Sequence, residues 1–401
     1  MEFPLDAFLD DLEILINTDS GTADIEGCSR MAAFFETRFR KAGFDTKLHR
    51  TGNAQRPVLL AKNPAAACVL PGVPAESGAI LPNATATEVQ AAASTLQPIQ
   101  LAGKPFFFCG HLDTVFPKGT TTARPYRRDG DLVYGPGTVD MKAGALLILY
   151  LAEYLAEAAP QIPLTIALNS DEEIGSPDSA ALLRSAAQDA QAIFIFEGQR
   201  KQGQFVNERK GIAKFAIDVS GIASHAGTAP AEGVSAILEL AKTIVDLSNL
   251  QHLERGTSVN VGLLEGGTAL NMIAPHAAAK MEVRYTEAKE FRRVLRALDN
   301  LQTHPHLDGA KIRVTRISHY PPLVITSQTR AMMERLAPLG LHYVRAGGTS
   351  DANRLADLGI PILDGCGPGG GFPHSEKEFL DITTVPQRFE RMLQILKALA
   401  G

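Results

Sequence analysis

The sequence has few cysteines, little excess charge and no long apolar run, and each shortage disfavours a class of protein. The four cysteines form no CxxC pair and lie far apart, which disfavours a disulfide framework and favours a reducing compartment. They are Cys28, Cys68, Cys109 and Cys366. A net charge of −5 over 401 residues gives no electrostatic reason to expect nucleic acid or an anionic membrane as a partner.

No segment is typical of membrane insertion or export. The most apolar stretch, AGALLILYLAEYLAEAA, contains Glu153 and Glu157 and is too short to span a bilayer, so we expect a buried helix there. The first residues, MEFPLDAFLDDLEI, are acidic and lack the basic and apolar regions of a secretory signal. We therefore expect a cytoplasmic protein that binds no membrane.

Length and composition indicate a globular enzyme with more than one domain. A single core stops growing at roughly 250–300 residues, and the composition of 45% hydrophobic and 21% charged residues is ordinary for such a protein. Short apolar runs alternate with helical patterns, which is typical of an α/β sheet. The clearest runs are PFFFCG, PLTIALN and AIFIF.

Residues 210–318 have a different pattern. We expect four strands in KGIAKFAIDVSG, SVNVGLLEGG, AAAKMEVRYT and AKIRVTRIS, with two amphipathic helices between them. This composition predicts a small α+β domain inserted into a larger one that comprises residues 1–209 and 319–401. Residues 63–104 are rich in Ala, Pro and Thr with little charge, and we interpret them as a low-complexity insertion.

Polar residues follow the predicted strands where each one ends. In open α/β sheets, ligands bind beyond the carboxyl ends of the strands. Two imidazoles and several carboxylates are expected at this one edge, and such a mixed set of nitrogen and oxygen ligands suits zinc or a similar transition metal. They are His111, Asp140, Glu172, Glu173, Glu197 and His374.

Several motifs together resemble those of the M20 metallopeptidase/amidohydrolase family. They are GHLDTV, YGPGTVDMKAG, NSDEEIGS, SHAGTAP, GGTSDA and the histidine of GFPHSE, in family order over nearly the whole chain. The most similar branch contains glutamate carboxypeptidase (carboxypeptidase G). The sequence DMKAG differs from the commoner DMKGG of the family only in a glycine replaced by alanine. The resemblance implies a mixed-sheet catalytic domain with a dinuclear metal site and an inserted lid and dimerisation domain.

The resemblance also implies two divalent metal ions per chain, with zinc expected and cobalt or manganese as alternatives. Asp140 would bridge the two ions, with a cis peptide bond to Met141. His111 and Glu197 would complete one metal site, and Glu173 and His374 would complete the other.

Three further residues receive catalytic roles. Asp113 lies two residues beyond His111 on an extended chain, projects to the same side, and could accept the second imidazole N–H. Glu172 is the expected general base for an attacking water. His225 resembles the family histidine that stabilises the oxyanion and that, in dimeric members, comes from the partner subunit. Because this chain has room for one such lid domain, we expect a homodimer.

The expected substrate-binding residues are Asn271, Arg284, Arg316 and Tyr320. In the glutamate carboxypeptidase branch an arginine tends to precede the proline after the lid, whereas here Tyr320 precedes Pro321. A phenol cannot offer a carboxylate a charged, two-pronged contact. Arg284 could bind the substrate carboxylate alone, or Arg316 could help from four residues upstream.

We therefore expect hydrolysis of an amide or peptide bond next to a free carboxylate, in small peptides or N-acyl amino acids, without a strict requirement for glutamate. An aminoacylase-like or deacetylase activity on N-acyl amino acids is the main alternative, because the metal chemistry cannot separate the two. A catalytically silent binding protein is a further alternative, but such a protein should lack metal ligands or the general base.

Overall fold

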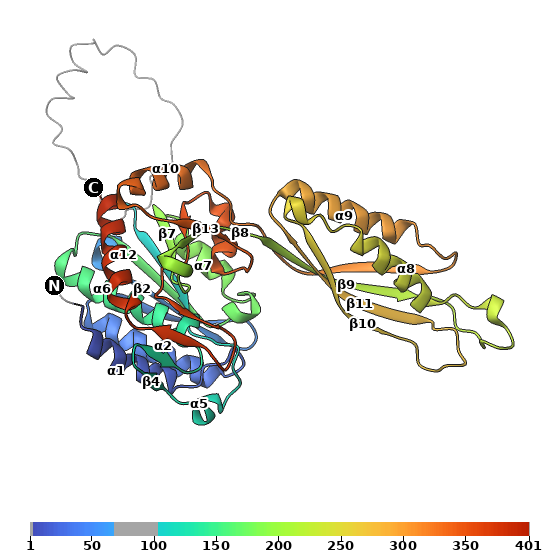
Figure 1. Cartoon of the computed structure of the whole chain (residues 1–401), viewed down its shortest axis with the longest axis horizontal. Helices are drawn as coiled ribbons and strands as arrows, with labels where there is room; N and C mark the ends of the chain where they lie inside the picture. Colours follow the sequence, from blue (N-terminus) through green and yellow to red (C-terminus); the bar gives the residue numbers. More distant parts are fainter. Residues whose placement is uncertain (1–2, 68–102, 401) are drawn as a thin grey trace, which may run out of the picture. The chain divides into compact units, whose positions relative to one another are not determined.

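The computed structural model describes residues 3–67 and 103–400, which belong to two compact units (Figure 1). The first unit comprises Met1–Gly203, Ala331–Leu341 and Ile360–Gly401, and the second comprises Gln204–Arg330 and His342–Gly359. Most of the insertion expected over residues 63–104 lies outside the described residues. Its first residue, Asn63, is buried and exchanges hydrogen bonds with the backbone of Ile162 and Leu164, so this position belongs to the fold.

A six-stranded mixed sheet forms the centre of the first unit, with the order β1-β2-β6-β3-β7-β14. The strands β6, β3, β7 and β14 are parallel, whereas β1 and β2 are antiparallel to their neighbours. The bounds are β1 (Asp45–Thr51), β2 (Arg56–Lys62), β3 (Phe106–His111), β6 (Leu164–Asn169), β7 (Ala192–Ile195) and β14 (Ile362–Leu363). This sheet confirms the predicted α/β fold class. Every residue of β3, β6 and β7 is buried, as expected for parallel strands covered on both faces.

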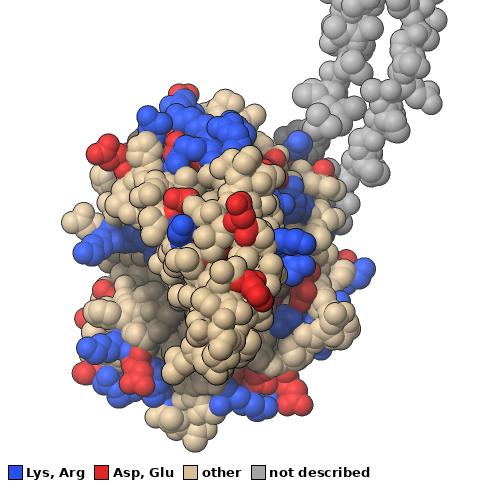
Figure 2. All heavy atoms as spheres, turned by 90° about the vertical axis from the view of Figure 1, so that its right-hand side faces the viewer, with Lys and Arg blue, Asp and Glu red and all other residues tan. Residues whose placement is uncertain are grey.

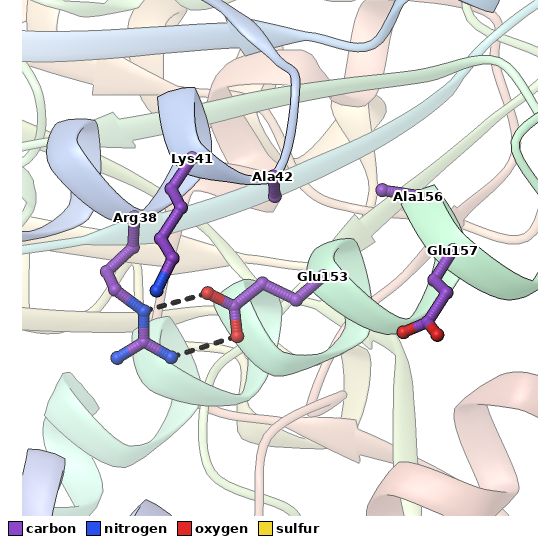
Figure 3. Close-up of a pocket in the computed structure, with 6 residues that line it drawn as sticks. All are labelled: Arg38, Lys41, Ala42, Glu153, Ala156 and Glu157. Atoms are coloured by element: carbon purple, nitrogen blue, oxygen red, sulfur yellow. Dashed lines mark hydrogen bonds and ion pairs between the residues drawn. The ribbon is translucent and has the colours of Figure 1, made fainter.

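Helices pack against this sheet and against one another. The predicted apolar helix is α6, which contacts β3 and packs against α1, α2 and α12. Arg38 of α2 joins three of these helices, because it forms ion pairs with Asp11 of α1 and Glu153 of α6, beside a pocket between α2 and α6 (Figure 3). The helices of the first unit are α1 (Leu5–Ile16), α2 (Ile25–Lys41), α3 (Pro64–Ala67), α5 (Thr120–Ala123), α6 (Ala143–Ala158), α7 (Ala180–Ala187) and α12 (Thr384–Ala400), and α10 (Ser327–Leu336) begins in the second unit and ends in the first.

A small antiparallel sheet in the first unit joins segments far apart in the sequence. Its order is β15-β16-β5-β4. The bounds are β4 (Arg127–Asp129), β5 (Leu132–Tyr134), β15 (Gly370–Gly371) and β16 (Phe379–Asp381). The pairing of β5 with β16 brings the segment after Tyr134 close to the segment before Phe379. These two segments carry Asp140 and His374.

The second unit is built on a four-stranded antiparallel sheet, with the order β10-β11-β9-β12, and two helices. Odd-numbered residues of β9, such as Phe215 and Ile217, point into a core formed with both helices. The bounds are β9 (Gly211–Ser220), α8 (Ala236–Ser248), β10 (Ser258–Gly266), β11 (His276–Tyr285), α9 (Ala288–Thr303) and β12 (Lys311–Tyr320). The unit also contains the parallel pair β8 (Phe205–Arg209) and β13 (Tyr343–Ala346), together with α11 (Asp351–Leu355), so its bounds differ from residues 210–318.

The surface in Figure 2 shows basic and acidic side chains interspersed among other residues. Among residues 3–67 and 103–400, each helix is too short or too polar to cross a bilayer. Cys28, Cys109 and Cys366 are buried thiols, and Cys68 lies outside the described residues. Burial raises the pKa of the Cys28 thiol to about 12, so this cysteine is protonated and unreactive at neutral pH.

Candidate metal centre

Three neighbouring parallel strands end beside one another and position the candidate ligands. His111 is the last residue of β3, the Asp171–Glu173 segment follows β6, and Glu197 follows β7 by two residues. Because β6, β3 and β7 are adjacent and parallel, their carboxyl ends meet at one edge of the sheet. The structure thus brings these predicted residues together.

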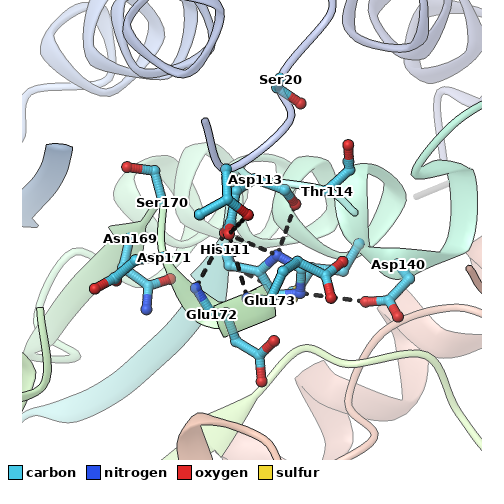
Figure 4. Close-up of polar contacts among 12 residues, drawn as sticks. Ser20, His111, Asp113, Thr114, Asp140, Asn169, Ser170, Asp171, Glu172 and Glu173 are labelled. Atoms are coloured by element: carbon cyan, nitrogen blue, oxygen red, sulfur yellow. Dashed lines mark hydrogen bonds and ion pairs between the residues drawn. The ribbon is translucent and has the colours of Figure 1, made fainter. Parts of the chain in front are cut away.

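His111 lies at the centre of one half of the cluster (Figure 4). Its imidazole is 1% exposed, and Nε2 lies 3.2 Å from Asp140 Oδ1 and 3.7 Å from Glu197 Oε1. On the other side of the ring, Nδ1 lies 2.9 Å from the backbone oxygen of Asp113 and 3.4 Å from its carboxylate. With Nδ1 donating to Asp113, Nε2 faces the carboxylates of Asp140 and Glu197, and in the neutral ring the Nε2 lone pair is available to a metal ion.

His374 defines the other half. Its Nε2 lies 3.0 Å from Asp140 Oδ2 and 3.1 Å from Glu173 Oε2. The two oxygens of Asp140 therefore face two different imidazoles. Asp140 is part of a π-turn, Thr138–Lys142, and its peptide bond to Met141 is cis, as the resemblance implies.

The Asp113 carboxylate was expected to accept the second imidazole N–H of His111. In the structure it accepts hydrogen bonds mainly from the neighbouring turn. Its oxygens accept hydrogen bonds from the backbone N–H groups of Glu172 and Glu173, each at 3.2 Å, and from the Thr22 hydroxyl at 2.8 Å. The backbone carbonyl of Asp113, and not the carboxylate, is the closer partner of the His111 ring. Asp113 thus holds both His111 and the two glutamates in place.

The carboxylates of the cluster stabilise positive charge on the two imidazoles. Burial lowers the pKa of His111, but the carboxylates of Asp113 and Asp140 outweigh that effect and raise it well above its usual value. Asp140 and Glu173 raise the pKa of His374 to about 11. Burial opposes ionisation of Asp140, yet the two imidazoles lower its pKa. The carboxylates thus create a strongly negative environment that a bound cation would neutralise.

The type and the spacing of the donor atoms also suit a metal ion. Potential ligand atoms of His111, Asp140 and Glu173 lie within 4.8 Å of one another, and the same holds for those of His111, Glu172 and Glu197. The Oε1 atom of Glu173 is buried and makes no hydrogen bond with any residue that the structure describes. A buried carboxylate oxygen without a donor is costly unless something else binds it. Imidazole nitrogens with carboxylate oxygens form a ligand set that zinc accepts.

Glu172 and Glu173 are adjacent, but their side chains leave the turn in different directions (Figure 4). Glu173 contacts His374, whereas Glu172 belongs to the group of His111 and Glu197. Their turn, Glu172–Ile174, begins where the Asp113 carboxylate accepts both backbone N–H groups. The geometry is compatible with one glutamate binding metal while the other approaches a water.

In the second unit, His225 and Asn271 lie in adjacent segments. His225 pairs with Met272 in a β-bridge, and the N–H of Ala226 donates to the backbone oxygen of Asn271 at 3.0 Å. The His225 Nδ1 atom accepts hydrogen bonds from the N–H groups of Gly227 and Thr228, each at 3.1 Å. The neutral ring must then carry its proton on Nε2, which makes His225 a hydrogen-bond donor.

Arg284 and Tyr320 share a row of the four-stranded sheet of the second unit, because both pair with Ile212. The Arg284 guanidinium already contacts Glu282 at 2.6 Å and the Gly347 carbonyl at 2.8 Å. Gly347 opens the GGTSDA segment. Tyr320 is 8% exposed, and one face of its ring is covered by the guanidinium of Arg354.

Arg316 is not brought together with Arg284 and Tyr320. It pairs with Phe215, whose side chain belongs to the helix-side core, and a register shift separates Arg316 from Ser318. One extra residue in a strand reverses which face the following side chains occupy. By this register, Arg316 lies on the face opposite Arg284 and Tyr320 although it is only four residues from Tyr320. On a regular strand, residues four apart share one face, and the bulge between Arg316 and Ser318 removes this relation.

Two residues beside the cluster were missed in the sequence. Thr22 donates to the Asp113 carboxylate, and Glu378 accepts backbone hydrogen bonds around Asp140. An acidic residue four positions after His374 was the only local signal for Glu378. For Thr22, 91 positions from Asp113, the sequence contains no signal of the contact.

Imidazoles and carboxylates gathered beyond the carboxyl ends of parallel strands are an arrangement that suits a metal-dependent hydrolase. The chain belongs to peptidase family M20/M25/M40, whose model matches residues 107–399. This match confirms both the resemblance and the assignment as a metallohydrolase.

Three known proteins illustrate the similarity. Carboxypeptidase G2 of a Pseudomonas species is 25% identical over 409 residues, which cover 98% of this chain and 90% of that protein. A Mycobacterium tuberculosis protein assigned as a succinyl-diaminopimelate desuccinylase is 30% identical over 278 residues, or 65% of this chain and 73% of that protein. The crystal structure of a Bacillus cereus aminopeptidase superposes with a TM-score of 0.76 at 20% identity, covering 99% of each chain. The three proteins are named for different activities. Their similarity therefore supports the family and the fold, and not a particular substrate.

Proposed function

We propose that the chain is a metal-dependent hydrolase of amide or peptide bonds next to a free carboxylate, acting on small peptides or N-acyl amino acids. The observation that carries this proposal is the position of Asp140, whose two oxygens face His111 and His374. A carboxylate shared between two imidazole-containing halves suits two divalent ions, with zinc expected and cobalt or manganese as alternatives. The proposed ligands are His111, Asp140, Glu173, Glu197 and His374.

When bound, such ions polarise the scissile carbonyl and lower the pKa of a water. Glu172 is the proposed general base, which removes a proton from the attacking water and transfers it to the leaving amine. Its placement in the group of His111 and Glu197, with a direction different from that of Glu173, supports this role.

His225 is proposed to donate a hydrogen bond to the oxygen that becomes negative during attack. The two backbone N–H groups on Nδ1 support this role, because they leave the ring proton on Nε2. We further propose that His225 acts on the centre of a partner subunit in a homodimer.

The surface of the second unit supports dimerisation through the lid. Its strand β10 is an edge of the sheet, and it exposes Leu263 and Leu264. Helix α8 exposes Ile237 and Val245, and a groove lined by α8 and β10 includes Ile237 and Leu264. An unpaired edge strand next to exposed apolar side chains is a common site of association.

Arg284 is the proposed ligand of the substrate carboxylate, with Asn271 and Tyr320 as further candidate contacts. A guanidinium can contact a carboxylate through two parallel hydrogen bonds. Glu282 competes for the same guanidinium, so substrate binding would require it to exchange partners. Arg316 has weaker support, because by register it lies on the other face of the sheet.

An N-acyl amino acid deacylase is the second candidate, and the similarity to the protein assigned as a desuccinylase favours it. Purified protein loaded with zinc, cobalt or manganese should be tested on N-acyl amino acids, on dipeptides and on matching amides that lack the carboxylate. We expect hydrolysis to be fastest next to a free carboxylate, and Arg284→Ala should raise KM for these substrates far more than for the matching amides that lack the carboxylate. Equal effects on both would contradict the assignment of Arg284, and no hydrolysis of any substrate would contradict the proposed function.

A further inference from the structure

Glu378 is a buried carboxylate with an unusual set of partners. It is 1% exposed and lies four residues after His374, directly before β16. Its Oε1 accepts the N–H groups of Val139 and Asp140, at 2.9 and 3.1 Å, and its Oε2 accepts the N–H of Gly137 at 3.1 Å. All three donors belong to the loop that carries the shared carboxylate of the metal centre.

The small sheet explains why Glu378 is close to this loop. In the β5–β16 pair, Phe379 lies opposite Tyr134, so the residue before Phe379 lies next to the chain that leaves Tyr134. The loop is also closely packed at Gly137. This residue has φ +73°, and a Cβ there would lie 2.4 Å from the Thr114 side chain, so a larger residue does not fit. Several backbone N–H groups that converge on one carboxylate hold a loop in a single shape.

We propose that Glu378 is a positioning residue for the metal centre, which holds Asp140 between the two imidazoles and fixes the segment of His374 relative to it. This inference rests on the proposed dinuclear site. Asp140 takes part in both halves of that site, but only one half also contains His374. If the Glu378 contacts are lost, both Asp140 and His374 are displaced from the half that contains Glu173. Only Asp140 is displaced from the half that contains Glu197.

Glu378→Gln is the sharpest variant, because it keeps the size of the side chain. One amide oxygen can still accept hydrogen bonds, but the NH₂ group must face at least one backbone N–H donor. The matched control is Glu239→Gln. Glu239 is likewise fully buried and accepts two backbone N–H groups, from His306 and Leu307, but it belongs to the second unit.

The measurement is calorimetric titration of the metal-free full-length protein with Zn²⁺, together with the visible absorption of the Co²⁺-substituted protein. We expect the unmodified protein and Glu239→Gln to bind two ions per chain. Glu378→Gln should bind the ion of the half with Glu173 roughly 10–100-fold more weakly, and the other ion with a smaller loss of affinity. The absorption of one Co²⁺ ion should change more than that of the other.

Two bound ions with unchanged affinities in Glu378→Gln, or equal weakening of both, would overturn the proposal. Failure of the unmodified protein to bind two ions would instead contradict the proposed dinuclear site. If Glu378→Gln does not fold, Glu378→Asp decides the question. The shorter carboxylate keeps its charge but cannot reach all three N–H groups, so one ion should again be weakened, and unchanged binding of both would overturn the proposal.

Discussion

Buried carboxylates occur in both units, but their partners differ. In the second unit, Glu290 is 2% exposed and accepts hydrogen bonds from the guanidinium of Arg293 and the hydroxyl of Thr257. Glu239 accepts hydrogen bonds from the ring and the backbone of His306. In the first unit, Glu173 keeps one buried oxygen that no described donor contacts. Glu239 and Glu290 are thus neutralised by cations of their own unit, whereas Glu173 retains a buried acceptor without a donor among the described residues.

This difference distinguishes carboxylates that stabilise the fold from carboxylates that suit a bound cation. An ionised carboxylate buried without a partner costs several kcal/mol, so a fold normally provides one. Where the partner is a neighbour, as for Glu290 and Arg293, the pair contributes to the local fold. Where Asp140, Glu173 and Glu197 gather around two imidazoles, the surplus of negative charge suits a bound cation. We expect the two kinds of carboxylate to behave differently when they are replaced.

Replacement of the proposed general base should have the largest effect. Glu172→Gln should lower kcat by roughly 10²–10⁴-fold, because the attacking water loses its proton acceptor. Metal content, measured by elemental analysis, should be unchanged. Glu239→Gln should keep its kcat, since that carboxylate only supports the fold. If Glu172→Gln lost metal in proportion to activity, Glu172 would be a ligand instead.

Metal binding should stabilise the protein through the first unit. At a free Zn²⁺ concentration of 100 times Kd, binding to the folded state adds about 2.7 kcal/mol per site. Scanning calorimetry of the full chain should therefore show a higher melting temperature after Zn²⁺ is added. Glu239→Gln should keep this increase and Asp140→Asn should lose most of it. An equal increase in both variants would mean that Zn²⁺ binds elsewhere.

The first unit of one chain and the second unit of its partner should together form one active site. Mixing inactive Glu172→Gln chains with inactive His225→Ala chains should recover activity, because a heterodimer contains one intact set of residues. With random exchange of equal amounts, recovery should approach about a quarter of the unmodified activity. No recovery, with subunit exchange shown independently, would mean that His225 acts within its own chain or has no catalytic role.

The smallest expected effect is a pH dependence of the second unit. Glu239 raises the pKa of His306, which outweighs the opposing effect of burial, and Asp246 adds to the increase. A pKa that is higher in the folded state stabilises the fold fully below the unfolded value of about 6.5. This contribution is lost as the pH rises through the folded-state pKa.

The loss should be below about 1 kcal/mol, because solvent screens the pair. Melting temperatures at pH 6 and pH 9 should therefore differ slightly less in His306→Gln than in the unmodified chain. The same difference in both would show that the ion pair does not stabilise the unit.

The strands and the residues at their ends could be predicted from the sequence because both depend on local patterns. A buried parallel strand is a short apolar run, as in β3, and a ligand such as His111 directly follows that run. Parallel neighbours then bring such ends together wherever each strand lies in the chain. The four strands and two helices of the second unit were likewise visible in their periodicity.

Only the tertiary structure decided how these elements meet. The extra residue in β12 moves Arg316 to the other face, and strand periodicity alone cannot locate it, because either register satisfies the local pattern. The contact of Glu378 with the Asp140 loop spans 238 positions, and it depends on the pairing of β16 with β5. Local patterns thus determined which residues could bind a metal. The long-range pairing of strands decided which backbone groups hold those residues in place, because hydrogen bonds between distant segments leave no periodic signal in the chain.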